Sequence, residues 1–561
     1  MGLFGAIQQA NSGLQAAQVG LQVVGNNIAN ASTPGYIRQR LELTPSIATR
    51  NGSLLLGHGV RTTGVVQMID KALAERVNAA STAVAGGQTL DKAYTQLESL
   101  VGTLDGGGIP EQLTTFNNAL HDLTTQPADR SLREFVILQG DALARTIRST
   151  HQQATDRQQE FNADLTGMSE QINRQLERVA KLNVEISTIE GGGTLGSDAT
   201  GLREQRYEAL AELSKFVELN VQEQPSGTVS VFVGGDYLVA EGNFREVYTA
   251  YSDEEKGFQV RIEETDSPLQ SKGGVLGATI QARNEIFGSF LADLDELATG
   301  LVRAMNDVHS QGQGRVGFDE LTGTNRGQRG VPLSSANLPF TPKNGTFQLS
   351  VVDSTGKVVS QNTIPVRVLN QVGDSTLDSI ATEINAIPGL TADITSHGRL
   401  SIGSESQVTF VFGEDTSGFV AAAGLNTFFV GSGASDINVN EVIKSNSDFL
   451  AISSGGIGQD TNALSKMVDL VDKPIDALDG KSVRDIFDSN VAVLGQKVSL
   501  QKSITDGATG LYETLHSQHL AITGVNIDEE SIQLIAYNRA FQASARVISV
   551  ASEMLDILVN I

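Results

Sequence analysis

Apolar residues at the two ends of the chain recur with the spacing of helices that pack along one stripe. The N-terminal row runs at alternating steps of four and three residues through Ala10, Ala17 and Val24, and its larger members are Leu3, Ile7, Leu14, Leu21 and Ile28. The C-terminal row has the same kind of steps, and its larger apolar members are Leu534, Phe541, Ile548 and Leu555. A repeat of 3.5 residues keeps one stripe of a helix facing a partner helix. The sequence therefore predicts coiled-coil-like partner helices at the two ends.

The N-terminal helix has too little to bury to be stable alone. The first 37 residues contain no Asp, Glu, Lys or Arg, and an isolated helix of this length is marginal in water. One C-terminal helix would cover only one side of this uncharged surface. The spacing by itself favours a helical hairpin within one chain, whereas the missing charges favour helices that also pack against neighbouring copies.

A turn must end the first helix between residues 26 and 36. Asn tolerates the left-handed geometry that closes helices, Pro forces the preceding residue toward extended structure, and Pro-Gly is a strong turn signal. The residues that carry these signals are Asn26, Asn27, Asn30, Pro34, Gly35 and Tyr36. An extended linker should follow.

The middle of the chain alternates between helical and strand patterns. Residues 70–219 are helical with breaks at 86–87, 106–110, 126–127 and 191–193, and 131–190 could form one helix about 90 Å long. Residues 226–264 alternate as in a small antiparallel sheet, helical spacing returns over 276–309, and 312–446 are rich in Gly, Ser and Thr with short strands. Helical spacing resumes after residue 447.

These patterns predict a multidomain α+β protein whose chain goes out and comes back. The terminal helices with their linker would form an axial-core domain from 1–68 and 525–561. An elongated helical bundle would follow from 69–311 and 447–524, with a small β-hairpin region at 226–264. A β-rich domain, 312–446, would be inserted at the far end.

Composition excludes several classes of function. The 561 residues carry a net charge of −25 with no long basic run, which argues against nucleic-acid binding because phosphate contacts need clustered Lys and Arg. No stretch approaches 18 uninterrupted apolar residues, so no membrane-spanning segment is expected. The chain has no Cys, which removes disulfides, thiolate metal sites and Cys nucleophiles.

No candidate chemical motif is complete. Residues 312–317 match a dinucleotide-binding spacing but follow a helix, and 480–482 resemble the end of a phosphate loop without its upstream Gly. His516 and His519 lie three residues apart but have no evident third ligand. We therefore expect no catalytic residue, no cofactor, no metal and no enzymatic activity.

The motifs at the two ends are similar to those of a known family. The stretch from Asn26 to Tyr36 resembles the signature of the axial proteins of the bacterial flagellum, which comprise rod, hook and hook-associated proteins. Residues 524–530 and 537–548 resemble the C-terminal signature of the hook-associated members, and segments within 119–129, 202–214 and 273–309 agree. The resemblance covers roughly residues 1–310 and 446–561, and the β-rich insertion matches no motif.

The resemblance implies a structural subunit of the flagellum at the junction between hook and filament. Its partners would be copies of itself in a ring, the hook protein on one side, and a second junction protein and the flagellin filament on the other. The protein would be secreted through the flagellum-specific type III apparatus with an export chaperone. The assembly interface would lie in the terminal rows, which could stay disordered until they pack.

Two other functions stay open at this stage. The chain could be another axial subunit, such as a hook or distal rod protein, although the long paired helices and residues 524–530 weigh against it. It could instead be a secreted surface adhesin or carbohydrate-binding protein with a helical stalk, in which case residues 312–446 would be the working part. A hydrolase hidden in those residues is a third and weaker alternative.

Overall fold

The computed structural model describes residues 3–51, 54–101, 108–190, 198–253, 257–474 and 480–559. It is a mixed α+β structure, as the sequence predicts, and it divides into two compact units. The first unit comprises residues 1–93, 159–283 and 499–561, and the second comprises 94–158 and 284–498. The three domain ranges expected from the sequence stay a prediction.

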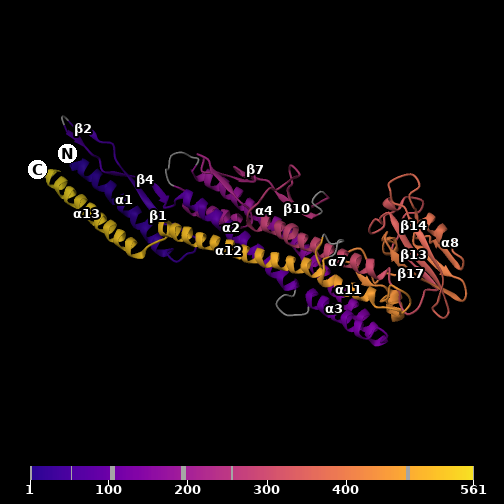
Figure 1. The fold of residues 1–561 in the computed structure, drawn as a ribbon. Helices are drawn as coiled ribbons and strands as arrows, with labels where there is room; N and C mark the ends of the chain where they lie inside the picture. Colours follow the sequence, from indigo (N-terminus) through magenta and orange to yellow (C-terminus); the bar gives the residue numbers. More distant parts are fainter. Residues whose placement is uncertain are drawn as a thin grey trace. The chain divides into compact units, whose positions relative to one another are not determined.

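The two ends of the chain lie side by side in the first unit. Helix α1 (Leu3–Ala29) packs along helix α13 (Ile527–Val559), and Figure 1 shows both chain ends at the same end of this antiparallel pair. The extended linker is an antiparallel ribbon of β1 (Gln39–Pro45) and β4 (Val60–Gln67), in which Gln39 pairs with Gln67. Strand β2 (Thr49–Asn51) pairs with β3 (Leu54–Leu56) between them. The ribbon contacts α1.

The rest of the first unit is built from long helices and two small sheets. It contains most of α2 (Lys71–Val101), the last part of α4 (Arg130–Glu190), α5 (Thr200–Phe216), α6 (Gly274–Gln281) and the last part of α12 (Val483–Thr523). One sheet joins β5 (Asn220–Glu223), β6 (Val229–Val233), β7 (Asp236–Ala240) and β8 (Asn243–Phe244); the other joins β9 (Val247–Ser252), β10 (Gly257–Ile262) and β11 (Ser267–Pro268). Valines that alternate along β6 are buried against α4 and α5 in one core.

Helices and a β-rich region make up the second unit. Its helices are α3 (Ile109–Thr125), the first part of α4, α7 (Gly288–His309), α11 (Asn462–Asp472) and the first part of α12, and α11 packs on both α3 and α7. A π-helical turn, Ala282–Phe287, precedes α7.

The β-rich region has a large apolar core of its own. Strand β13 (Gly345–Asp353) lies between β14 (Val358–Val366) and β17 (Val408–Asp415), and β16 (Leu400–Ser404) lies between β12 (Glu320–Thr322) and β15 (Leu390–Ile394). Helix α8 (Leu377–Asn385) begins at a capping box in which Thr376 and Ser379 bond each other's backbone. Smaller elements of this unit are Leu333–Ser335, α9 (Phe419–Ala422), β18 (Phe429–Val430), β19 (Asn438–Val439), α10 (Glu441–Ser445) and Ser447–Phe449.

Most predicted element boundaries are confirmed, and one predicted break is wrong. Helix α4 covers the long segment expected from residue 131 to Glu190, and α13 follows the break at Gly524. The expected break at Gly86 and Gly87 does not exist, because α2 continues through both residues. A Cβ atom at Gly86 would lie 3.1 Å from the carbonyl oxygen of Gly274, so these glycines permit close packing. The expected breaks at 106–107 and 191–193 lie outside the described residues.

Candidate assembly interface

The pairing of α1 with α13 is built on small residues in a seven-residue register. A Cβ atom added to Gly13 would lie 3.0 Å from the Ser544 hydroxyl, and one added to Gly20 would lie 2.5 Å from the Tyr537 ring. One further step of seven residues along α1 brings Asn27 against Glu530. Only residues without large side chains allow the two helix backbones to approach this closely.

The predicted N-terminal row lies partly inside this contact and partly beside it. Ala10, Ala17 and Val24 are buried, whereas the larger residues of the row, Leu3, Ile7, Leu14, Leu21 and Ile28, are only half-buried. The line of closest approach alternates Ala10, Ala17 and Val24 with Gly13, Gly20 and Asn27. The large side chains therefore flank the contact with α13, and their part in assembly stays a prediction.

The predicted C-terminal row lies on the side of α13 that faces α1. Ala551 is buried, and the half-buried members of the row are Leu534, Tyr537, Phe541, Ser544, Ile548 and Leu555. Leu558 is exposed near the end of the helix. The sequence spacing thus locates the less exposed side of α13.

The Asn27 side chain joins the N-terminal motif to the start of α13. It is fully buried, and its Nδ2 donates to the Gln39 carbonyl oxygen at 2.9 Å and to Glu530 Oε2 at 3.0 Å. Its Oδ1 accepts from the Gln39 backbone amide at 3.0 Å and from the Tyr36 hydroxyl at 2.9 Å. An Asn side chain has two donors and one oxygen with two lone pairs, so this environment uses its full bonding capacity.

Tyr36 and Arg38 complete a polar cluster with Asn27 and Glu530. Burial, with the nearby charges of Glu204 and Glu530, raises the pKa of Tyr36 to about 12, so its hydroxyl stays a donor. Arg38 Nε lies 2.7 Å from Glu530 Oε1, and Arg38 Nη1 lies 2.9 Å from Glu529 Oε2. The Arg38 amide also donates to the Thr523 carbonyl oxygen at 2.8 Å. We call Asn27, Tyr36, Arg38 and Glu530 the terminal cluster.

The remaining motif residues shape the turn that brings the terminal cluster together. Asn26 Nδ2 donates to the Tyr36 hydroxyl at 3.4 Å, and Asn30 Nδ2 donates to the Asn26 carbonyl oxygen at 2.9 Å. Pro34 is exposed, and Gly35 has a φ of 80°, which favours glycine. The sequence motif therefore acts through the fold of the turn.

Sequence reasoning found one half of the terminal cluster and missed the other. Asn27 and Tyr36 belong to the predicted motif, whereas neither Arg38 nor Glu530 was predicted as a functional residue. Glu530 is only 2% exposed, and a buried carboxylate needs a partner. A signal was available, because Arg38 is the first charge after 37 uncharged residues and Glu530 opens the helix predicted to pair with them.

A second face of α13 exposes large apolar side chains. The exposed fraction reaches 67% at Ile532 and 61% at Ile557, and the other members of this set are Ile535, Val547, Val550 and Met554. The apolar surface of each of these side chains is removed from water only if another molecule covers it. We call these six residues the outer stripe.

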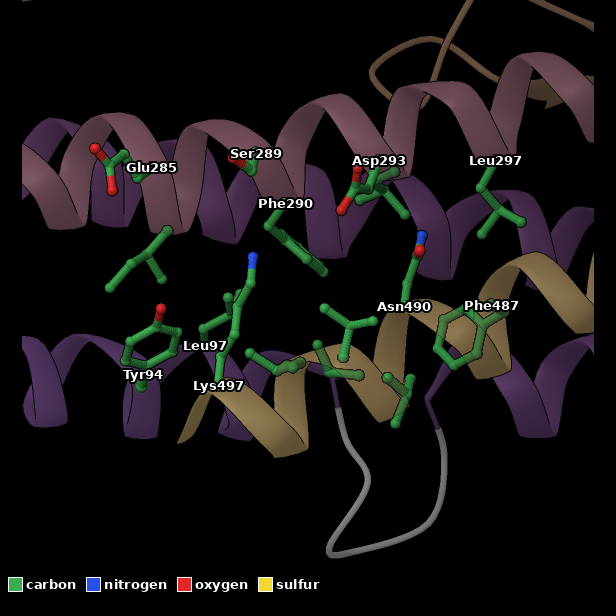
Figure 2. Close-up of a pocket in the computed structure, with 16 residues that line it drawn as sticks. Tyr94, Leu97, Glu285, Ser289, Phe290, Asp293, Leu297, Phe487, Asn490 and Lys497 are labelled. Atoms are coloured by element: carbon green, nitrogen blue, oxygen red, sulfur yellow. The ribbon is translucent and has the colours of Figure 1, made fainter. Parts of the chain in front are cut away.

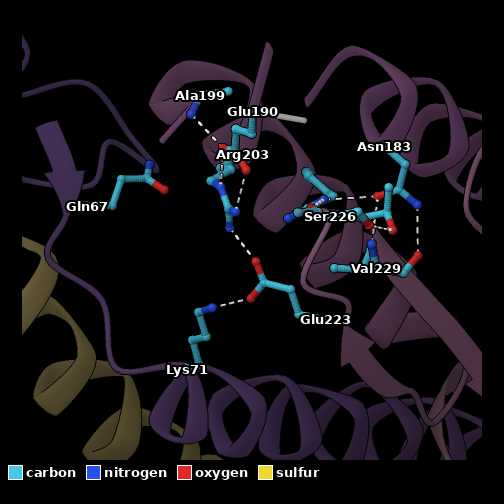
Figure 3. A network of polar contacts seen from close by, with 12 residues as sticks. Gln67, Lys71, Asn183, Glu190, Ala199, Arg203, Glu223, Ser226 and Val229 are labelled. Carbon is cyan, nitrogen blue, oxygen red and sulfur yellow. Dashed lines mark hydrogen bonds and ion pairs between the residues drawn. The ribbon is translucent and has the colours of Figure 1, made fainter. Parts of the chain in front are cut away.

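A network of ion pairs supports the ribbon and its neighbouring helices. Figure 3 shows Arg203 between Glu190, to which its Nη2 lies at 2.8 Å, and Glu223, which also pairs with Lys71. Although burial alone would raise the pKa of Glu190, the bonds from Arg203 hold it below its ordinary value. Gln67 of β4 donates to the Thr200 carbonyl oxygen at 2.9 Å, so the ribbon is tied to the start of α5.

A pocket in the second unit is lined by both apolar and polar side chains. The cavity of about 100 Å³ lies among α2, α7 and α12, and Figure 2 shows the apolar side chains of Leu97, Phe290 and Phe487 among the residues that line it. Burial raises the pKa of Asp293, one of its few polar residues.

The structure adds two further observations on possible sites. Within the described ranges, no group of three His, Cys, Asp or Glu residues is placed to hold a metal ion, and His516 stacks on Tyr512. None of the helices in the described part of the chain is long and apolar enough to cross a membrane.

Family models match three parts of the chain. The model described as the flagellar hook-associated protein FlgK helical domain matches residues 94–325. The flagella basal body rod protein model matches residues 7–36, and the C-terminal model of the flagellar basal body rod FlgEFG proteins matches residues 516–561. The rod protein model covers most of α1, and the C-terminal model covers the whole of α13.

Curated relatives and a solved structure agree with these matches. Flagellar hook-associated protein 1 of Salmonella typhimurium is 25% identical over 568 residues, which cover 99% of both chains. The proteins of the same name from Escherichia coli and Bacillus subtilis are each 24% identical over 99% of this chain. The flagellar hook junction protein FlgK of Burkholderia pseudomallei, 15% identical, shares the fold with a TM-score of 0.52 over 80% of this chain and all of its own.

These matches show that the chain is an axial protein of the bacterial flagellum, in the class of rod, hook and hook-associated proteins. Within that class it is similar over almost its whole length to flagellar hook-associated protein 1, also called FlgK. Its homologues are structural proteins of the flagellum rather than enzymes.

Proposed function

We propose that the chain is the structural subunit of the junction between hook and filament, and that neighbouring subunits join through the outer stripe of α13 together with α1. The observation that carries this packing is the exposure of the outer stripe, which consists of Ile532, Ile535, Val547, Val550, Met554 and Ile557. Covering a large apolar side chain fully contributes about 1.5–3 kcal/mol. Six such residues on one helix are a strong driving force for association.

The uncharged surface of α1 suits the same role. Between its half-buried apolar residues it exposes Phe4 and several Gln side chains, and it has no charge that burial would leave unpaired. Removing a charge from water costs far more than removing an amide that finds a hydrogen bond. A ring of copies can therefore enclose α1 without an electrostatic penalty.

Relatives named for association with the hook and for the hook junction support the following partners. The hook protein would lie on one side, and a second junction protein and the flagellin filament on the other. Before assembly the subunit would be secreted through the type III apparatus with an export chaperone. Terminal helices that pack mainly through Ala and Gly are weakly held, which suits passage through a narrow channel in an unfolded state.

A matched pair of substitutions tests the role of the outer stripe. Val550 of α13 and Val372 of the β-rich region are both exposed valines, so Val550→Glu and Val372→Glu should both leave the monomer folded by circular dichroism. An unpaired carboxylate buried between subunits costs several kcal/mol. Val550→Glu should therefore reduce attached filaments at least about tenfold, as counted by electron microscopy, while Val372→Glu should not. Normal filaments with Val550→Glu would exclude the outer stripe as an interface.

A further inference from the structure

A buried arginine in the second unit has no acidic partner. Arg133, in the first turns of α4, is 1% exposed. Its Nε donates to the Pro127 carbonyl oxygen at 3.1 Å and its Nη1 to the Leu450 carbonyl oxygen at 3.0 Å. In the described part of the chain no carboxylate forms an ion pair with it. These carbonyl oxygens are neutral acceptors, so they do not compensate the positive charge of the guanidinium group. Buried charges in proteins are usually paired with an opposite charge.

Arg133 lines a pocket together with a second arginine. The cavity of about 250 Å³ is bordered by Arg133, Arg315, Gln459, Asp460 and Thr461, among others. Arg315 is half-exposed; its Nη1 lies 3.5 Å from the Ala128 carbonyl oxygen and 3.5 Å from Asp448 Oδ1. Burial and the neighbouring Arg315 charge lower the pKa of Arg133 to about 10. The two guanidinium groups therefore repel each other across an open space.

Two helix N-termini add to the positive potential of this pocket. Arg133 lies near the start of α4, and Thr461 immediately precedes α11, so the positive ends of both helix dipoles are close. Asp448 lies 3.5 Å from Arg315, and its charge opposes the effect of Arg315 on the pKa of Arg133. Two other acids are already used in hydrogen bonds, and one of them, Asp129, caps α4 with a bond of 2.7 Å from the Ser131 amide. The Asp460 carboxylate accepts hydrogen bonds from the backbone amides of Asn462 at 2.8 Å and Gly455 at 2.6 Å. Neither carboxylate pairs with Arg133.

We propose that this pocket binds a carboxylate, namely an Asp or Glu side chain of a neighbouring copy of the chain. Arginine presents donors in a planar fork that matches a carboxylate. The chain has 65 acidic and 40 basic residues, so its copies offer many acidic side chains and few competing bases. The choice of a neighbouring copy as the source rests on the proposed function, whereas carboxylate binding by the pocket does not.

Thermal unfolding of the full-length monomer tests the pocket without assembly. The probe is N-acetylglutamate amide at constant ionic strength, and N-acetylglutamine amide is the neutral control. At tenfold excess over its Kd, the carboxylate should raise the Tm by about 2–4 °C. The rise should be lost in Arg315→Gln and retained in Arg329→Gln, a more exposed arginine paired with Asp378 in the same unit.

Nuclear magnetic resonance of ¹⁵N-arginine-labelled protein provides a second readout. The Nε–H signal of Arg133 should shift saturably with the carboxylate probe and not with the amide. No shift in the wild type, or the same Tm response in Arg315→Gln, would overturn the site. Binding of the probe by the wild type, together with normal filament attachment in Arg315→Gln, would overturn the neighbouring copy as its source.

Discussion

The terminal helices and the β-rich region bury their apolar side chains to very different degrees. In the β-rich region, large residues such as Phe347, Phe410, Phe412 and Phe419 are fully buried in one core. In the terminal helices the buried side chains are chiefly small, and the large ones are half-buried or, like Ile532 and Ile557, exposed. The core of the first region is complete within one chain, whereas we propose that neighbouring subunits cover the exposed side chains of the second.

Removing a large side chain from the β-rich core should have the largest effect on stability. Phe412→Ala leaves a cavity among closely packed aromatic residues, including Phe410 with its ring centroid at 5.8 Å. We expect a loss of about 3–5 kcal/mol in the free energy of unfolding, measured by urea denaturation. The control Val372→Ala, at a fully exposed position, should change stability by less than about 0.5 kcal/mol. Equal effects would refute the contrast in burial.

Acidification should weaken the same unit through His309. This side chain is fully buried; its Nδ1 lies 2.8 Å from the Asn426 carbonyl oxygen, and the Ala451 amide donates to its Nε2 at 3.0 Å. Burial lowers its pKa to about 4. The unfolded chain therefore binds the proton first, so this contribution to stability is complete above about pH 6.5 and falls between pH 6.5 and 4, by about 3 kcal/mol in total.

Urea denaturation of the wild type and His309→Gln between pH 7 and 4 measures this dependence. The variant should be less stable at pH 7 but should lose less on acidification. The exposed His397→Gln serves as the control and should follow the wild type. A wild-type pH profile in His309→Gln would assign the acid sensitivity to other groups.

Two glycines of α1 should respond in opposite directions, with the smallest effects of the series. A Cβ atom at Gly20 would lie 2.5 Å from the Tyr537 ring, whereas one at Gly25 would meet nothing within 4 Å. Gly20→Ala should destabilise the terminal pair by about 1–3 kcal/mol through overpacking. Gly25→Ala should stabilise it by about 0.5–1 kcal/mol, because Ala favours helix. Hydrogen exchange of the α1 amides measures both, and stabilisation by Gly20→Ala would contradict the close approach.

Local patterns predicted the elements well, because they depend on residues near one another in the chain. The rows of apolar residues at the two ends located α1 and α13. The close contacts could not be predicted, because they depend on residues far apart. Gly13 and Gly20 lack the side chains that a spacing argument counts, yet they define where the helices meet. Likewise, Arg38 and Glu530 lie 492 residues apart, so their pairing emerges only when the two ends of the sequence are considered together.

The account depends most on burial of the outer stripe between subunits. The chain has no Cys, so this burial can be measured directly with a single introduced cysteine. A single cysteine introduced by Val550→Cys should react readily with a maleimide in the purified monomer, because Val550 is exposed there. In isolated flagella the same cysteine should react at least about tenfold more slowly, whereas Val372→Cys should react similarly in both. An unchanged rate at position 550 in assembled flagella would contradict the account.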